Sequence, residues 1–124
     1  MKRKRKNFDY SKPSCIIDRN KSGRKAADLI YPCSSLPDTP ENQEQAREAL
    51  VQAREILRTV KPPQADRWGR NLMYLEGLER IFIALERKNY IEACDEMCEY
   101  MMMYWTEETH DGLILLLEKA KKAV

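Results

Sequence analysis

The chain has 124 residues, of which 43% are hydrophobic and 34% charged, enough apolar material for one buried core and little for a second. Composition excludes collagen-like and wholly disordered chains. No apolar run reaches the roughly 18 residues of a membrane helix, and no apolar stretch follows the basic residues 1–6 as a secretory signal requires. We expect a soluble protein that binds no membrane and is cytoplasmic, or nuclear if the host cell is eukaryotic.

The charge is divided unevenly along the chain. Residues 1–30 hold ten Lys and Arg against three Asp, a net charge of +7, whereas residues 31–124 have a net charge of −5. Such a like-charged, apolar-poor end predicts a flexible arm, and the turn formers from Pro32 to Pro40 mark its border. Basic arms bind phosphates by releasing counterions. The predicted nucleic-acid-binding residues are Lys2, Arg3, Lys4, Arg5, Lys6, Arg24 and Lys25.

The basic arm has three further interpretations. Residues 2–6 also read as a nuclear-import signal in a eukaryotic host. A solvated tail that only aids solubility, or an arm that binds an acidic protein, fits the same composition. The choice between DNA and RNA stays open.

From residue 38 onward, apolar residues recur at spacings of three and four, the period of an α-helix. Thr39, Asn89 with Glu92, and Thr106 are helix-start signals. We therefore predict an all-α fold, a small antiparallel bundle of about four helices with a disordered basic N-terminal arm. The predicted domains are a flexible arm over 1–37 and a bundle over 38–124, with helices over 40–60, 66–88, 90–105 and 107–122.

The first predicted helix has a basic stripe beside its apolar face, formed by Arg47, Arg54, Arg58 and Lys61. This stripe either extends a phosphate-binding surface or is a solvated face. We favour the solvated face, because a Glu three residues before Arg47 and another before Arg58 can pair with them locally.

The second predicted helix buries one wide apolar face. Its members are Trp68, Leu72, Met73, Leu75, Leu78, Ile81, Phe82 and Leu85. The turn from Leu85 to Ala93 resembles the inter-helix turn of a tetratricopeptide repeat, in which a Tyr and an Ala three residues later, here Tyr90 and Ala93, hold two helices together. No second copy of the repeat occurs, so we predict only a helical hairpin.

The stretch from Met97 to Trp105 is apolar around most of a helix, so more than one side must be covered. Two interpretations stay open: the stretch is the core of the bundle, or it binds a protein partner or a second copy of the chain. The predicted partner-binding residues are Met101, Met102, Tyr104 and Trp105.

Cys94 and Cys98 share one face of a predicted helix and are expected to be buried free thiols, as in a reducing compartment. A zinc site would need two further ligands, which Cys33, Cys15 or His110 could supply only if the arm folded back onto the bundle. We therefore predict no metal and no cofactor.

No catalytic motif is present. The chain has one histidine, His110, with no evident nucleophile spaced near it, and it lacks a glycine-rich phosphate loop. The sequence favours a non-enzymatic helical adaptor or regulatory protein whose arm binds nucleic acid and whose bundle binds a partner or itself. The alternative is a protein-interaction module or small inhibitor that acts through the bundle alone.

Overall fold

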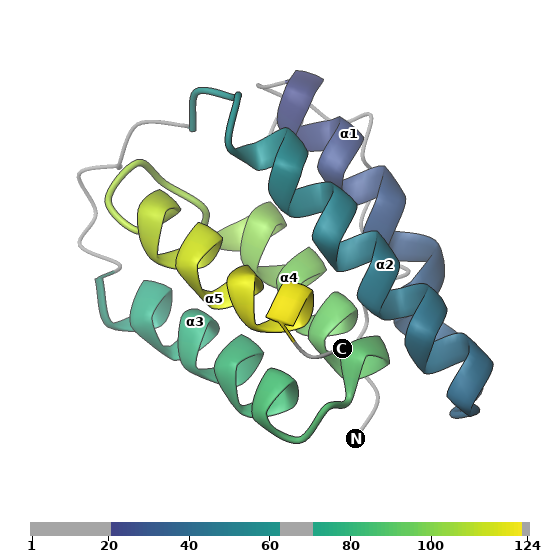
Figure 1. Ribbon diagram of the computed structural model, residues 1–124. Coiled ribbons are helices and arrows are strands. Elements are labelled where there is room, and N and C mark those ends of the chain that lie inside the picture. Colours follow the sequence, from purple (N-terminus) through teal and green to yellow (C-terminus); the bar gives the residue numbers. More distant parts are fainter. Residues whose placement is uncertain (1–20, 63–70, 123–124) are drawn as a thin grey trace.

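The computed structural model describes residues 21–62 and 71–122, and within these ranges every regular element is helical (Figure 1). The all-α prediction is confirmed for the described residues. No helix in them is long and apolar enough to cross a membrane. The elements are α1 (Lys21–Ile30), the 3-10 helix η3 (Tyr31–Ser35), α2 (Pro40–Leu57), α3 (Asn71–Glu86), α4 (Tyr90–Met103) and α5 (His110–Lys122).

The described residues contain five α-helices, one more than the four predicted. The extra helix, α1, lies in the segment assigned to a flexible arm, and its Ala26, Ala27 and Ile30 are fully buried. The net charge of residues 1–30 gave no indication of this short apolar face, because most of the basic residues lie before it in the sequence. Residues 21–35 therefore belong to the bundle, and residues 1–20, the rest of the predicted arm, lie outside the described residues.

Helix α4 is the centre of the described bundle. It contacts α1, η3, α2 and α3, while α5 packs on α2 and α3 (Figure 1). Helices α1 and α2 lie side by side as one pair, and α3 and α4 form a second pair. An apolar α4 follows from this position, because neighbouring helices cover it on several sides.

The predicted helix starts at Thr39 and Asn89 are confirmed. The Thr39 hydroxyl accepts a hydrogen bond from the Asn42 amide at 3.1 Å, and the Asn89 carboxamide oxygen accepts one from the Glu92 amide at 3.1 Å. Each side chain satisfies an amide that the first helical turn leaves unpaired. The helix predicted over 107–122 begins later, at His110, because a separate turn precedes it.

A tight turn joins α3 to α4, as the predicted hairpin requires. The Asn89 amide donates to the Ala84 carbonyl and the Lys88 amide to the Leu85 carbonyl, each at 3.0 Å. Lys88 has a φ of 57°, so this helix end has the hydrogen bonding of a Schellman motif with a left-handed residue. The first residues of the helix predicted over 66–88 lie outside the described residues.

Candidate functional site

The predicted phosphate-binding residues fall in two parts of the chain. The five basic residues from Lys2 to Lys6 lie outside the described residues. Arg24 and Lys25 lie in the first half of α1, where Lys25 is exposed and Arg24 is half-buried. The next residue, Ala26, is fully buried, so α1 presents basic groups on one side and packs with the other.

The local ion pairs predicted on α2 are confirmed. Arg47 Nη2 lies 2.6 Å from Glu44 Oε2, and Arg58 Nη1 lies 3.1 Å from Glu55 Oε1. The hydrogen bond from Arg47 lowers the pKa of the Glu44 carboxyl. Arg47 also donates to the Ala120 carbonyl of α5 at 3.1 Å. These arginines of the basic stripe are neutralised within the bundle.

Arg54 links α2 to α5, which no local sequence signal indicated. Its side chain is nearly buried, and its Nε donates to the Ile114 carbonyl at 3.1 Å. Its guanidinium pairs with Glu118 of α5 and, at 3.0 Å, with Glu55. Arg54 therefore joins two helices that meet only in the folded chain.

The predicted partner-binding residues lie in the core of the described chain. Met101 and Trp105 are 0% exposed, Met102 is 3% exposed and Tyr104 is 8% exposed. The partner-surface interpretation assumed that a body of about 90 residues could not cover this stretch. Residues 21–35 help to cover this stretch. The burial of its side chains agrees with the first of the two interpretations, in which the stretch is part of the core.

Close contacts with two glycines show how this aromatic stretch is covered. A Cβ on Gly23 of α1 would lie 2.4 Å from Trp105 Cζ3, and one on Gly77 of α3 would lie 2.8 Å from Tyr100 Cδ1. The Tyr100 and Thr109 hydroxyls share a hydrogen bond in the interior. Helix α1 therefore packs against the Trp105 ring and helix α3 against the Tyr100 ring, each at a glycine.

The exposed large apolar side chains of the described residues lie on α3 and α5, not on α4. They are Leu75, Phe82, Ile83 and Leu115, with exposures of 58%, 39%, 41% and 71%. The prediction that Leu75 and Phe82 belong to the buried face of their helix is wrong, because both side chains are exposed. The correct core face of α3 includes Ile81, Ala84 and Leu85.

Charged side chains line an open groove of about 310 Å³ between α3 and α4. Arg80 comes from α3, Arg87 from the turn that follows α3, and Glu92 and Glu96 come from α4. Arg80 Nε lies 3.3 Å from Glu96 Oε1, and Glu96 is only 6% exposed. This pair ties the hairpin together at one end of the groove.

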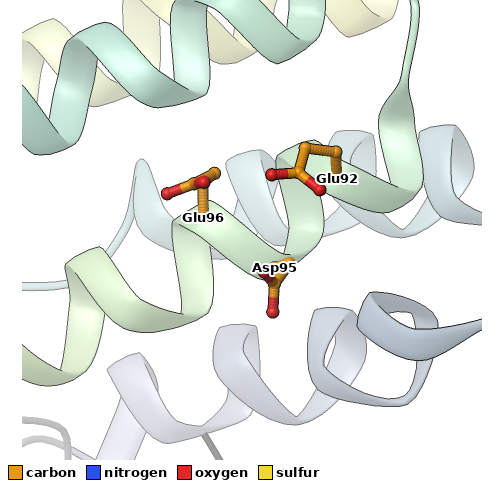
Figure 2. A group of neighbouring side chains, drawn as sticks. All are labelled: Glu92, Asp95 and Glu96. Carbon is orange, nitrogen blue, oxygen red and sulfur yellow. The ribbon is translucent and has the colours of Figure 1, made fainter. Parts of the chain in front are cut away.

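Three carboxylates gather on the first turns of α4. Oxygens of Glu92, Asp95 and Glu96 come within 4.8 Å of one another, a spacing that could hold a divalent cation. Figure 2 shows Glu92 and Glu96 on the side of the helix that faces α3, with Asp95 pointing the opposite way. Because Arg80 already neutralises Glu96, the cluster has less negative charge than its three carboxylates suggest.

The cysteines of the described residues, Cys33, Cys94 and Cys98, are free and buried. Cys33 lies in η3, which packs on α4, so the segment predicted as an arm does fold back onto the bundle. Cys94 Sγ lies 3.7 Å from the Ala46 carbonyl oxygen. The fourth cysteine, Cys15, lies outside the described residues.

The thiols of Cys33 and Cys94 are hydrogen-bonded neighbours with opposite pKa shifts. A hydrogen bond from Cys94 lowers the pKa of Cys33 to about 7, because it stabilises the thiolate. The same interaction, together with burial, raises the pKa of Cys94 well above its ordinary value. The sequence analysis joined Cys33 to Cys94 only as possible zinc ligands and did not predict a direct pair of thiols, since nothing local indicates that η3 meets α4.

His110 is engaged by the aromatic core. Trp105 Nε1 donates to His110 Nδ1 at 3.1 Å, and both side chains are buried. In this arrangement Nδ1 is an acceptor, so it is not available to take a proton from a substrate.

Comparison with known proteins identifies no relative of this chain: no protein-family model, no curated protein and no solved structure matches it.

Proposed function

We propose that the chain is a non-enzymatic nucleic-acid-binding protein in which the basic N-terminal residues contact phosphate and the helical bundle is the scaffold. The observation that carries this proposal is the separation of charge. Residues 1–30 have a net charge of +7, against −5 for the rest of the chain. Each Lys or Arg that neutralises a phosphate releases counterions, which favours binding with little sequence preference.

Internal pairing of the bundle's cations supports this assignment. Five of them have carboxylate partners within the described residues: Arg47, Arg54, Arg58, Arg80 and Lys119. A phosphate would have to displace these carboxylates before it could bind there. The basic residues up to Lys25 are therefore the favoured source of phosphate contacts. Lys25 is the last of them, and its side chain is exposed on α1.

The engagement of His110 supports the non-enzymatic part of the proposal. The only histidine of the chain is 8% exposed, and its Nδ1 accepts a hydrogen bond from Trp105. General acid-base catalysis would need a titratable group within reach of a substrate. A buried ring that already has a partner does not supply one.

The test is binding of the full chain to a labelled mixed-sequence duplex and to a single strand over a salt series. One variant carries Gln at the five basic positions from Lys2 to Lys6. A matched control also loses five positive charges, at exposed bundle positions, by changing Arg58, Lys61, Arg87, Lys88 and Lys121 to Gln. Substitution is preferred to deletion because truncation at residue 35 would remove the buried residues of α1 and η3.

The full chain is expected to bind with a slope of log affinity against log salt of about −0.9 for each phosphate neutralised on duplex DNA. The arm variant should lose several units of slope and at least about tenfold in affinity at low salt, and the control much less. A third variant, Arg24→Gln with Lys25→Gln, should reduce the slope by about two units or less. No binding by the full chain at low salt, or equal losses in the arm variant and the control, contradicts the proposal.

The exposed apolar residues favour a second candidate, a protein-interaction module that acts through the bundle alone. Leu75, Phe82 and Leu115 are exposed on α3 and α5. Large apolar side chains that stay exposed on two contacting helices are candidates for a protein contact. If nucleic acid does not bind, Leu75→Lys with Leu115→Lys should abolish partner binding or self-association while helicity by circular dichroism is retained.

A further inference from the structure

Two buried thiols from separate elements meet in the core, Cys33 of η3 and Cys94 of α4. They are 3% and 0% exposed, and their side chains are in hydrogen-bond contact. Each also lies near a carbonyl of a different helix: Cys33 Sγ is 4.0 Å from the Leu29 oxygen and Cys94 Sγ is 3.7 Å from the Ala46 oxygen. Neighbouring sulfurs on different elements are the starting arrangement for a disulfide.

Cys98 differs from Cys33 in its relation to Cys94. It lies four residues further along the same helix, α4, where a regular backbone holds two sulfurs poorly for a bond. The packing of η3 on α4 therefore selects Cys33 as the partner of Cys94.

We propose that Cys33 and Cys94 are a redox site that forms a reversible disulfide on reaction with hydrogen peroxide, fixing η3 to α4. This site is independent of the proposed binding to nucleic acid. Peroxide is small enough to reach a thiol that is 3% exposed through modest local opening.

The reaction proceeds in two steps. The Cys33 thiolate attacks one peroxide oxygen, so an S–O bond forms, the O–O bond breaks and the leaving hydroxide takes up a proton to become water. Cys94 sulfur then attacks the Cys33 sulfenic acid, forming the S–S bond, breaking the S–O bond and releasing a second water with the Cys94 proton. Two thiols and one hydrogen peroxide thus give one disulfide and two waters, and the sulfurs lose the two electrons that peroxide accepts.

The two thiols are suited to different roles in this sequence. Thiolates are the reactive form of cysteine, and the hydrogen bond from Cys94 stabilises the thiolate of Cys33. Cys94 keeps its proton, since its own pKa is raised. Cys33 is therefore the attacking thiol and Cys94 the resolving thiol. A small thiol such as dithiothreitol should reverse the bond by exchange.

The test uses the full chain with Cys15→Ser, which leaves Cys33, Cys94 and Cys98. The protein is treated with a few equivalents of hydrogen peroxide, its remaining thiols are alkylated in denaturant, and its peptides are mapped by mass spectrometry. We expect the peptides of Cys33 and Cys94 to be joined with the loss of two hydrogens, and dithiothreitol to separate them. The added Cys98→Ser change should leave the link intact, and the added Cys33→Ser change should abolish it.

A second readout is thermal unfolding of the peroxide-treated chain. The link closes a long loop and restricts the unfolded chain, so the unfolding midpoint should rise on oxidation in the Cys15→Ser chain and stay unchanged with Cys33→Ser. Full alkylation of Cys33 and Cys94 after peroxide, a link between Cys94 and Cys98, or sulfinic acid at Cys33 without a link would overturn the proposal. The peptide map of the peroxide-treated Cys15→Ser chain tests the proposal even if the Cys33→Ser variant does not fold.

Discussion

Gly23 of α1 packs directly against the indole ring of Trp105. A Cβ on Gly23 would lie 2.4 Å from Trp105 Cζ3 and 2.8 Å from Cη2, closer than real side-chain contacts allow. Because Trp105 is 0% exposed, the ring has no solvent-facing space to move into. The lack of a side chain at Gly23 therefore sets how closely α1 approaches the core.

Gly23→Ala is expected to destabilise the chain by about 1 kcal/mol, and by no more than about 2 kcal/mol. Overpacking costs typically about 1–3 kcal/mol, and the higher helix propensity of Ala, about 1 kcal/mol, offsets part of this cost. The free energy of unfolding in urea measures the effect. Lys25→Ala, at an exposed position of the same helix, is the control and should change stability by less than about 0.5 kcal/mol. A Gly23→Ala chain as stable as the wild type would show that Trp105 accommodates the methyl group.

Arg54→Ala is expected to cost about 2–3 kcal/mol. The substitution leaves the Ile114 carbonyl without its donor and Glu118 without its partner, and Glu118 is partly exposed, which limits the penalty. Arg58→Ala is the matched control: its pair with Glu55 is exposed on both sides, so its loss should cost about 0.5 kcal/mol or less. Urea unfolding of both variants checks the difference, and equal costs would contradict the role of Arg54 as a link between α2 and α5.

Gln43→Ala is expected to cost about 1–2 kcal/mol, because Gln43 of α2 caps the start of α4. Its oxygen accepts from the Tyr90 amide at 2.7 Å and the Ile91 amide at 3.2 Å, and its nitrogen donates to the Asn89 oxygen at 3.1 Å. Removal leaves two helix-terminal amides without this acceptor. The exposed Gln45→Ala is the control and should have little effect in the same urea experiment. Gln43→Glu should retain part of the stability, since it keeps the acceptor.

The parts of the fold that the sequence predicted are those decided by local chemistry. Thr39 and Asn89 cap helices through residues three positions away, and the Glu44 and Arg47 pair spans a single turn. Side-chain type and spacing are sufficient for such features. Helix boundaries were accordingly close to those observed.

Features that depend on contacts between distant segments could not be predicted. Nothing near Gly23 in the chain indicates that Trp105 will cover it, and nothing near Cys33 indicates Cys94. Because residues 21–35 were assigned to an arm, the predicted bundle had too few residues to cover the apolar stretch that ends at Trp105. Assigning α1 to the arm thus gave the wrong helix count, and it left out the residues that cover Trp105 in the described chain.

The last prediction concerns the charge of Cys33. In the folded chain its pKa is about 7, against an ordinary value of 9.0. Folded Cys33 therefore binds fewer protons than the unfolded chain between these values. Its contribution to stability is fully present above pH 9 and is lost as pH falls through about 7. The raised pKa of Cys94 has the opposite sign, so the Cys94 contribution is lost as pH rises above 9.

Alkylation of Cys33 by iodoacetamide in the Cys15→Ser chain checks this prediction, with each cysteine followed by mass spectrometry. The rate at Cys33 should rise through pH 7 and level off above about pH 8, because the thiolate is the reacting form and is then nearly complete. With Cys94→Ala the hydrogen bond to the thiolate is gone, so the rate should keep rising toward pH 9. A rate at Cys33 that also rises through pH 9 in the Cys15→Ser chain would show that Cys94 does not stabilise the thiolate, or that Cys33 reacts only after the chain unfolds.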